Sequence, residues 1–381
     1  MVLPVGQGSD NQHANSRTII IPSAPPSDGD VIHQSHYIDF IVVNGDDRYV
    51  IRCERKAVLE SSVELAKVIN AGPTSGRRND NHFIINNVDK HDFELVIRFL
   101  ETKFIKFRDH YHILRILEVA DRYNCPDLVI HIVKELDLQL SSSTVLDVFR
   151  SLWYYNSIST NISPPEAPTV KEKKKTKKHQ HPAPFTPEEY LAALLNNSLQ
   201  LIDMQAELIL TKSQMLELRF EELEMIAKRE ALQMQSELVL FNCLADWSVE
   251  ECKRKKLDPN PENRRRVLGA LCYTPRYLTM TTMEFEKACT RVDLLDSAEI
   301  ALVTAAIKGK KLTNLTDEQN NMLERFRTPR PAYSRLPIHL SDRTNPKNYK
   351  KKMRRAERGN DDGCCSNFGL NCLAILACIF D

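Results

Sequence analysis

Four of the ten cysteines in this 381-residue chain lie within its last eighteen residues: Cys364, Cys365, Cys372 and Cys378. An apolar run at residues 373–380 surrounds the last of them, and a polybasic stretch at 347–358 precedes the group. Thiols beside apolar and basic residues are typical of reversible S-acylation, in which acyl chains and a basic patch together bind a membrane. The four cysteines are therefore candidate S-acylation sites in a tail that contacts a membrane.

Other chemistry stays open for this tail. Its last four residues, Cys378 to Asp381, have the form of a prenylation box, but a terminal Asp fits that motif poorly. A zinc site needs paired ligands, and only Cys364 and Cys365 come near that spacing. The apolar run is too short for a transmembrane helix, which needs about 20 apolar residues. An unmodified tail, either disordered or packed on the core, is the remaining alternative.

A second cluster of one residue type is the lysine run at 171–178, with six Lys and one Glu. Its candidate targeting patch, for nuclear import or an anionic surface, consists of Lys173, Lys174, Lys175, Lys177 and Lys178. A solvated loop is the alternative, because runs of like charge stay hydrated. No aromatic residues alternate with these lysines, so stacking on nucleic-acid bases is not expected. The net charge of +1 thus hides basic segments at 171–178 and 325–358 and an acidic remainder.

Residue types that support catalysis do not form a recognisable pattern in this sequence. The pairs His110/His112 and His179/His181 are spaced two apart, whereas ligands on one helix face are spaced three or four apart. The sequence contains no phosphate-binding glycine loop, nucleophile elbow or zinc-protease motif. We therefore expect no enzymatic activity, no cofactor and no metal, and a chain that acts by binding other proteins.

Hydrophobic patterning predicts that strands and helices alternate in the first folded segment. Residues 37–45 and 48–53 are β-rich runs around Asn44-Gly45-Asp46-Asp47, which predicts a hairpin. One helix is expected over 55–70, a strand over 82–88, and further helices between 91 and 138. The polar residues before the hairpin contain no apolar export signal, so the thiols are expected to stay reduced in the cytosol or nucleus.

The second folded segment is predicted to be all helical. Apolar residues recur at helical spacing from Leu216 to Trp247, which predicts three short helices in succession. Glu221 and Glu222 are expected to open one helix, where the helix dipole favours negative charge. The whole chain is then predicted to have seven parts: a disordered segment at 1–35, an α+β domain at 36–138, a linking helix at 139–156, a Lys/Pro-rich disordered insertion at 157–186, an all-α domain at 187–308, a basic linker at 309–358 and a Cys-rich apolar tail at 359–381.

The first folded segment resembles a BTB/POZ domain, on the residues Asp39-Phe40, Lys56-Ala57-Val58-Leu59 and Ala120-Asp121-Arg122-Tyr123. It departs from that family at Arg55, where a His is usual, and at Glu101, where a Tyr is usual. The helices from Leu216 to Trp247 resemble the BACK domain that follows BTB. Residues 251–271 and 275–288 are similar to the BTB–BACK subfamily whose typical members end in a PHR β-sandwich. No Gly- and aromatic-rich β region follows, so a PHR domain is expected to be absent.

This resemblance implies a non-enzymatic adaptor that forms a BTB homodimer and brings an unknown substrate protein to a cullin-3 RING ubiquitin ligase. It implies a cullin contact at Leu65, Val68 and Ile69; the alternative is that these side chains fill the BTB core. The hydrophobic-x-Glu element of many cullin-binding BTB domains is replaced by Gly72-Pro73-Thr74-Ser75. A cullin-independent dimeric scaffold, tethered to membranes by the acylated tail, is the alternative function. A cytoplasmic, cytosolic location with membrane association is expected rather than a nuclear one.

Overall fold

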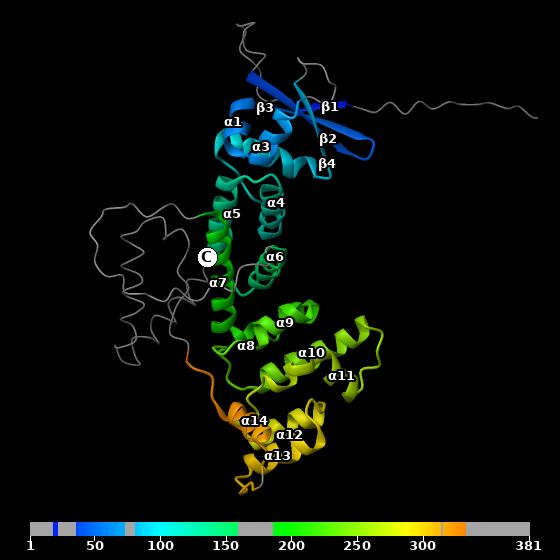
Figure 1. The fold of residues 1–381 in the computed structure, drawn as a ribbon, viewed down its shortest axis with the longest axis vertical. Helices are drawn as coiled ribbons and strands as arrows, with labels where there is room; N and C mark the ends of the chain where they lie inside the picture. The colour runs from blue at the N-terminus through cyan, green and yellow to red at the C-terminus, as the bar shows by residue number, and fades with distance from the viewer. Residues whose placement is uncertain (1–17, 22–35, 73–80, 159–185, 314, 333–381) are drawn as a thin grey trace, which may run out of the picture. The chain divides into compact units, whose positions relative to one another are not determined.

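The computed structural model describes residues 18–21, 36–72, 81–158, 186–313 and 315–332, which belong to two compact units that divide after Ile132 (Figure 1). The first unit contains a four-stranded sheet in the order β1–β3–β2–β4. The strands are β1 (Thr18–Ile21), β2 (Tyr37–Asn44), β3 (Asp47–Glu54) and β4 (His82–Asn86).

The predicted hairpin is confirmed, because β2 and β3 pair antiparallel from Tyr37↔Glu54 to Asn44↔Asp47. Gly45 in its turn has φ of 60°, a left-handed conformation that glycine adopts without a Cβ clash. Strand β4 adds to β2 in parallel, and β1 adds to β3 in parallel. Strand β1 lies in the segment that we predicted to be disordered, so that prediction was wrong for these four residues. Its β-branched residues pair with a strand about 30 positions away, which a local composition argument does not detect.

The helices of the first unit are α1 (Arg55–Ser61), α2 (Val63–Asn70), α3 (Lys90–Thr102), α4 (His110–Arg122) and the start of α5 (Pro126–Leu138). Helices α1 and α3 pack against β3. The single helix predicted over 55–70 is in fact two, divided at Ser62. The Ser62 hydroxyl accepts a hydrogen bond from the Leu65 amide (3.1 Å) and donates one to the Tyr123 carbonyl (2.5 Å), so it begins α2 as an N-cap.

Aromatic side chains fill the core between the sheet and these helices. The Phe40 ring meets Phe93 edge-on with centroids 5.6 Å apart, and Phe93 meets Tyr123 at 5.3 Å. Edge-to-face pairs of this kind stabilise a core beyond the area that they bury. The core thus joins β2, α3 and the end of α4.

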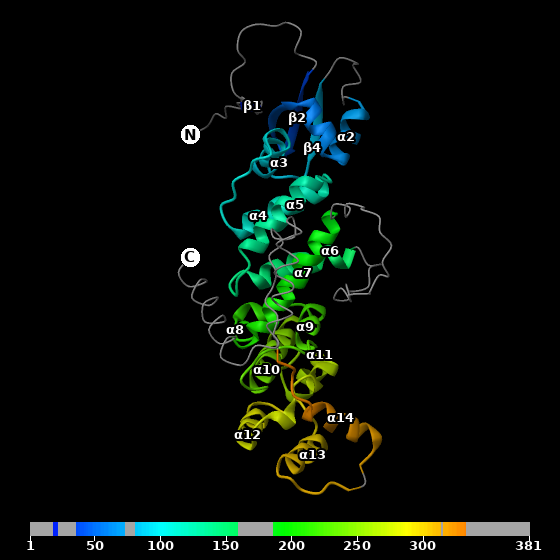
Figure 2. The ribbon, with the colours of Figure 1, turned by 90° about the vertical axis from the view of Figure 1, so that its left-hand side faces the viewer.

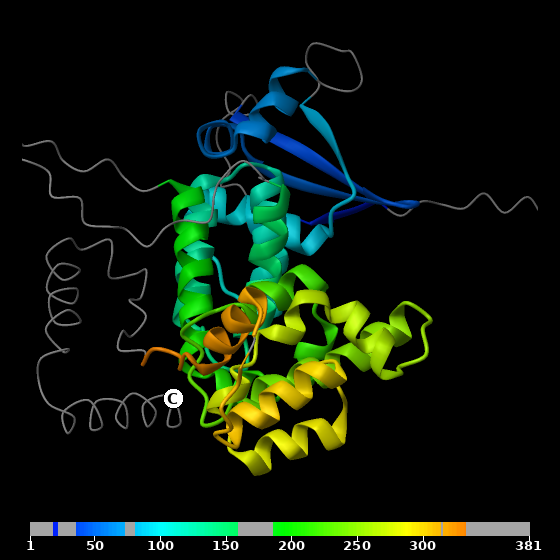
Figure 3. The same ribbon diagram turned by 60° about the horizontal axis from the view of Figure 1, so that its bottom comes forward.

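The described residues of the second unit form helices and the connections between them, with no strand. It contains the end of α5 and the following elements: α6 (Val145–Ile158), α7 (Pro187–Met204), α8 (Ala206–Ile209), η2 (Ser213–Glu217), α9 (Phe220–Ala227), α10 (Leu238–Arg254), α11 (Pro261–Leu268), η3 (Gly269–Tyr273), η4 (Tyr277–Thr279), α12 (Thr282–Arg291), α13 (Ser297–Ile307) and α14 (Asp317–Arg327). Helices α6 and α7 lie side by side (Figure 3). Helix α10 packs on α11 and α12, and α12 packs on α13 (Figure 2).

Several helices of this unit begin with reciprocal capping boxes. At the start of α7 the Glu189 amide donates to the Thr186 hydroxyl (3.3 Å), and the Thr186 amide donates to the Glu189 carboxylate (2.8 Å). The pairs Thr281/Glu284 and Asp296/Glu299 begin α12 and α13 in the same way. Each box satisfies amides that the helix itself leaves without partners, and this defines where the helix starts.

The segment from Leu216 to Trp247 contains the end of η2, helix α9 and the start of α10. The acidic opening of α9 at Glu221 and Glu222 is confirmed. Residues 231–235, which our periodicity argument counted as helical, are not helical. Backbone hydrogen bonds join them to α7 and α8 instead: the Gln233 amide donates to the Asp203 carbonyl (2.8 Å), and the Gln233 carbonyl accepts from the Glu207 amide (3.3 Å).

Helix α14 lies within the range predicted as a basic linker, 309–358, so this range is not a linker throughout. Phe326 of α14 is fully buried, and its ring meets Tyr277 edge-on with centroids 4.9 Å apart. Two buried side chains, Leu323 and Phe326, attach this otherwise polar helix to the core. Throughout the residues described above, no helix combines the length and apolar character that a membrane crossing requires.

Candidate partner-binding surfaces

The predicted cullin contact on α2 is mostly buried. Leu65 is fully buried and Ile69 nearly so, whereas Val68 is half-buried. The Ser62 cap orients α2 so that Leu65 and Ile69 point into the core of the first unit. Core filling, the alternative that the sequence left open, therefore describes these two residues, and only Val68 retains surface for a partner.

Sequence reasoning missed a more exposed apolar side chain, Phe104, in the connection between α3 and α4. Its exposed fraction is 72%, although the next residue, Ile105, is buried. Phe107 anchors the same connection by stacking on His131, with ring centroids 6.2 Å apart. Phe104 therefore projects from a connection that its neighbours hold in place. No periodic signal marks it, because it lies outside any helix or strand.

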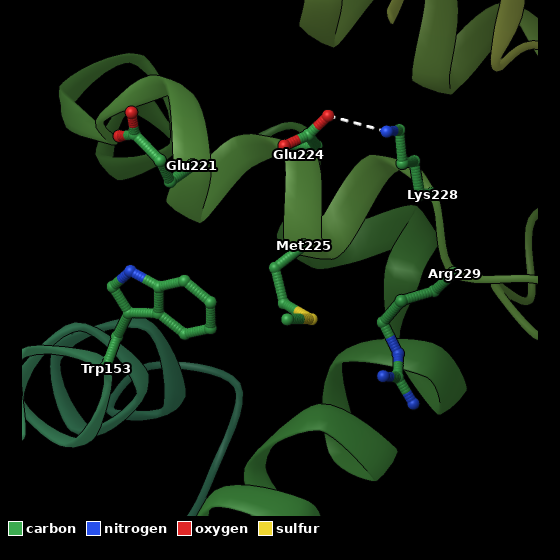
Figure 4. Close-up of a pocket in the computed structure, with 6 residues that line it drawn as sticks. All are labelled: Trp153, Glu221, Glu224, Met225, Lys228 and Arg229. Atoms are coloured by element: carbon green, nitrogen blue, oxygen red, sulfur yellow. Dashed lines mark hydrogen bonds and ion pairs between the residues drawn. The ribbon is translucent and has the colours of Figure 1, made fainter. Parts of the chain in front are cut away.

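The second unit carries an open pocket of about 500 Å³, shown in Figure 4. Its lining residues are Trp153, Glu221, Glu224, Met225, Lys228 and Arg229, and we call it the Trp153 pocket. Trp153 comes from α6, and the other five come from α9 and the two residues after it. In Figure 4 the Trp153 indole and the Met225 side chain lie on opposite sides of the same space. Both side chains are half-buried, so an apolar surface remains accessible.

The two cations of the Trp153 pocket are already paired within the unit. Lys228 Nζ lies 2.6 Å from Glu224 Oε1, along the helix. Arg229 donates from Nε and Nη2 to the two carboxylate oxygens of Asp203, each at 2.6 Å. Asp203 lies on α7 and is fully buried, so this fork-to-fork pair fixes the end of α9 against α7.

A short segment after α14 is fastened beside this pocket by a second buried ion pair. Arg330 donates from Nε to Glu237 Oε1 (2.6 Å) and from Nη1 to the Arg229 carbonyl (2.5 Å). The side chains of Arg330 and Glu237 are both nearly buried. Gln233 also donates from Nε2 to the Pro331 carbonyl (3.0 Å). Residues 330–331 thus pack on the helical unit and are not part of a linker.

The family model described as "BTB And C-terminal Kelch", or BACK, matches residues 185–259, which include α7 to α10. BTB/POZ domain-containing protein 6-B of Danio rerio is 42% identical over 115 residues, which cover 29% of this chain and 24% of that protein. BTB/POZ domain-containing protein 6 of Mus musculus is 39% identical over 100 residues, covering 26% and 18%. BTB/POZ domain-containing protein 3 of Homo sapiens is 35% identical over 116 residues, covering 30% and 22%.

These matches support a BTB–BACK protein. The matched region of the chain spans a quarter or less of the length of these curated relatives. The small sheet followed by many helices agrees with an α+β BTB domain before an all-α BACK domain. Most of the residues that line the Trp153 pocket lie within the range that the BACK model matches.

One departure of this BTB–BACK protein from the family pattern has a structural explanation. The carboxylate of Glu101 accepts a hydrogen bond from the Glu54 amide (2.8 Å). Glu54 is the residue before α1, where amides lack partners within the helix. Glu101 also pairs with Arg98 at 3.5 Å, so its charge is compensated. The substituted side chain therefore joins α3 to the start of α1.

The described cysteines of the BTB–BACK protein are not poised for chemistry. Burial raises the pKa of Cys125 to about 11 and the pKa values of Cys243 and Cys272 to about 12. Such thiols stay protonated at neutral pH and are poor nucleophiles and poor metal ligands. Among the residues with described positions, no His, Cys, Asp and Glu side chains gather into a metal-binding cluster.

Two predicted sites lie outside the described residues. They are the candidate S-acylation sites Cys364, Cys365, Cys372 and Cys378, and the candidate targeting patch Lys173, Lys174, Lys175, Lys177 and Lys178. Both stay predictions.

Proposed function

We propose that this BTB–BACK protein is a non-enzymatic adaptor that forms a homodimer through its α/β unit and brings a substrate protein to a cullin-3 RING ubiquitin ligase. The match of the BACK family model to α7–α10 carries this proposal. The described accessible features suit protein binding: apolar side chains stand exposed on the α/β unit, and the helical unit carries an open pocket. An adaptor needs two such surfaces, one for the ligase and one for the substrate.

For the cullin contact we propose Val68 and Phe104. Exposed aromatic side chains on a fixed backbone contribute strongly to protein interfaces, because they bury much area at little entropic cost. Phe104 has this character, since Ile105 and Phe107 anchor its connection. Truncation of such an anchor typically costs about 2 kcal/mol or more of binding free energy.

Co-purification from cells tests the proposal. The full chain is expected to recover cullin-3 and to be dimeric by light scattering. Phe104→Ala is expected to lower cullin-3 recovery at least tenfold. Met283→Ala is a matched control, because Met283 is 80% exposed on α12 of the helical unit. An intact dimer that recovers no cullin-3 would overturn the adaptor function.

The burial of Leu65 and Ile69 favours a second candidate, a cullin-independent dimeric scaffold held at membranes by an acylated tail. These two side chains offer no surface to a cullin, and the following Gly72-Pro73-Thr74-Ser75 lacks the hydrophobic-x-Glu element. Replacement of Cys364, Cys365, Cys372 and Cys378 by Ser is expected to move this scaffold from membrane to cytosolic fractions. An unchanged distribution between the fractions would rule out the tethered scaffold.

A further inference from the structure

The Trp153 pocket combines a surface that attracts cations with an accessible carboxylate. The face of an indole ring carries negative electrostatic potential, and a guanidinium or ammonium group within about 6 Å of the ring is attracted to it. Met225 provides an apolar wall on which the alkyl part of a long basic side chain can pack. The pocket volume of about 500 Å³ is ample for one such side chain and its neighbours.

Glu221 is the carboxylate of the pocket that can pair with a cation of a bound partner. Lys228 is held by Glu224 at 2.6 Å, and Arg229 by Asp203. The nearby Arg219 donates from Nη2 to Glu222 Oε1 at 2.7 Å, and this carboxylate is the main cause that raises the pKa of Arg219. The charge of Glu221 raises the same pKa by a smaller contribution, without a hydrogen bond. Each neighbouring cation therefore has another carboxylate as its close partner, while the Glu221 side chain is exposed at the rim.

The segments that form the pocket are also acidic as a group. Described residues 133–158 and 186–237 contain six Lys or Arg against thirteen Asp or Glu, a net charge of −7. The remaining described residues of the unit, 238–313 and 315–332, contain sixteen Lys or Arg against thirteen Asp or Glu, a net charge of +3. Negative charge is thus concentrated in the part of the sequence that forms the pocket. Complementary charge favours encounter with a basic partner and disfavours an acidic one.

The walls of the pocket are held in place before any partner binds. The Asp203–Arg229 pair fixes the end of α9, and Arg330 holds the Arg229 carbonyl. The Glu222 carboxylate accepts from the Arg219 amide (2.9 Å) and so fixes the start of α9. A surface that is already ordered loses little entropy on binding.

We propose that the Trp153 pocket is a docking site for a basic peptide segment of a partner protein, whose Arg or Lys side chain lies over the Trp153 indole and pairs with Glu221. This proposal rests on the adaptor function and deepens it, because it names the chemistry of the segment that the helical unit holds. The α/β unit then engages the ligase, and the Trp153 pocket engages the substrate.

Intrinsic fluorescence provides the test, because the chain has two tryptophans and Trp247 is fully buried. The probe is a blocked pentapeptide, Gly-Leu-Arg-Leu-Gly, and its control has neutral citrulline in place of arginine. The full chain is expected to show a saturable change in emission with the arginine peptide and about tenfold weaker binding of the citrulline peptide. Because the contact is electrostatic, 0.5 M NaCl is expected to weaken binding of the arginine peptide.

Variants localise the site. Glu221→Gln is expected to weaken the arginine peptide about tenfold, and Trp153→Leu is expected to abolish the emission change and to weaken binding measured by calorimetry. Glu286→Gln, at an exposed carboxylate of α12, is the matched control and is expected to bind as the unmodified chain does. Equal binding of the two peptides, or unaltered binding by Glu221→Gln, would overturn the proposal.

Two further outcomes distinguish this proposal from occupation of the pocket by the chain's own lysine run and from the adaptor function itself. If the peptide binds only after Lys173, Lys174, Lys175, Lys177 and Lys178 are changed to Gln, the pocket belongs to the chain's own lysine run, and the partner proposal is overturned. Glu221→Gln is expected to leave cullin-3 recovery unchanged. Loss of peptide binding with cullin-3 still recovered therefore counts only against the pocket, and the reverse result counts only against the adaptor function.

Discussion

The buried pair between Asp203 and Arg229 gives the sharpest prediction about stability. Asp203→Asn keeps the volume of the side chain but removes its charge and one of its two acceptor oxygens. The new amide NH₂ group would face the guanidinium N–H donors that now lie 2.6 Å from the carboxylate. Arg229 would then remain largely buried without an anionic partner.

Loss of one partner of a buried ion pair costs about 3–5 kcal/mol. The Arg229 side chain keeps 24% of its surface exposed, so water compensates part of its charge. We therefore expect the lower end, about 3 kcal/mol, for the decrease in free energy of unfolding. In a unit of this size, each kcal/mol corresponds to about 2–4 °C in Tm.

Urea unfolding followed by tryptophan emission measures this change, since Trp247 lies in the core of the same unit. Arg229→Met in the Asp203→Asn background removes the unpaired cation, so the double variant is expected to be more stable than Asp203→Asn alone. Glu250→Gln is the control, because its ion pair with Lys253 is exposed and is expected to contribute about 1 kcal/mol or less. If Asp203→Asn costs no more than Glu250→Gln, the argument about burial is refuted.

Three further predictions concern the folded chain. Between pH 9 and 11 the Tm should fall. Burial raises the pKa of Cys125 to about 11 and that of Cys243 to about 12, so these thiols stay protonated in the folded state while they ionise near pH 9 in the unfolded chain. A constant Tm over this range would contradict the prediction. Trp247→Phe removes the Nε1 donor to the Leu218 carbonyl (2.8 Å) and should cost about 1–3 kcal/mol in urea unfolding, whereas no measurable change would show that this hydrogen bond is dispensable. Arg330→Ala removes the cationic partner of Glu237, whose carboxylate keeps only the Arg276 amide, and should accelerate amide hydrogen exchange at 328–332. Exchange rates equal to those of exposed Arg327→Ala would contradict the attachment of this segment.

Features that depend on local sequence were predicted well. The hairpin around Gly45, the helix that starts at Thr186-Pro187 and the acidic opening of α9 all follow from the preferences of neighbouring residues. The BTB–BACK assignment also followed from short stretches of sequence. These features share one property: the residues that determine them lie within a few positions of one another.

Features that depend on distant residues were missed. Strand β1 requires β3, and the break at Ser62 requires the Tyr123 carbonyl, 61 positions away. The non-helical stretch at 231–235 depends on hydrogen bonds to Asp203 and Glu207. The Trp153 pocket combines α6 with α9, about 70 positions further along the chain. No local pattern encodes such pairings, because tertiary contacts override helix propensity there.

The central claim, that this BTB–BACK protein is a cullin-3 adaptor, is tested most directly by mixing the purified full chain with purified cullin-3. Size-exclusion chromatography with light scattering then measures the mass of what elutes. The proposal predicts a complex that contains two copies of this chain and two of cullin-3. A chain that stays dimeric and elutes separately from cullin-3 at micromolar concentration would contradict it.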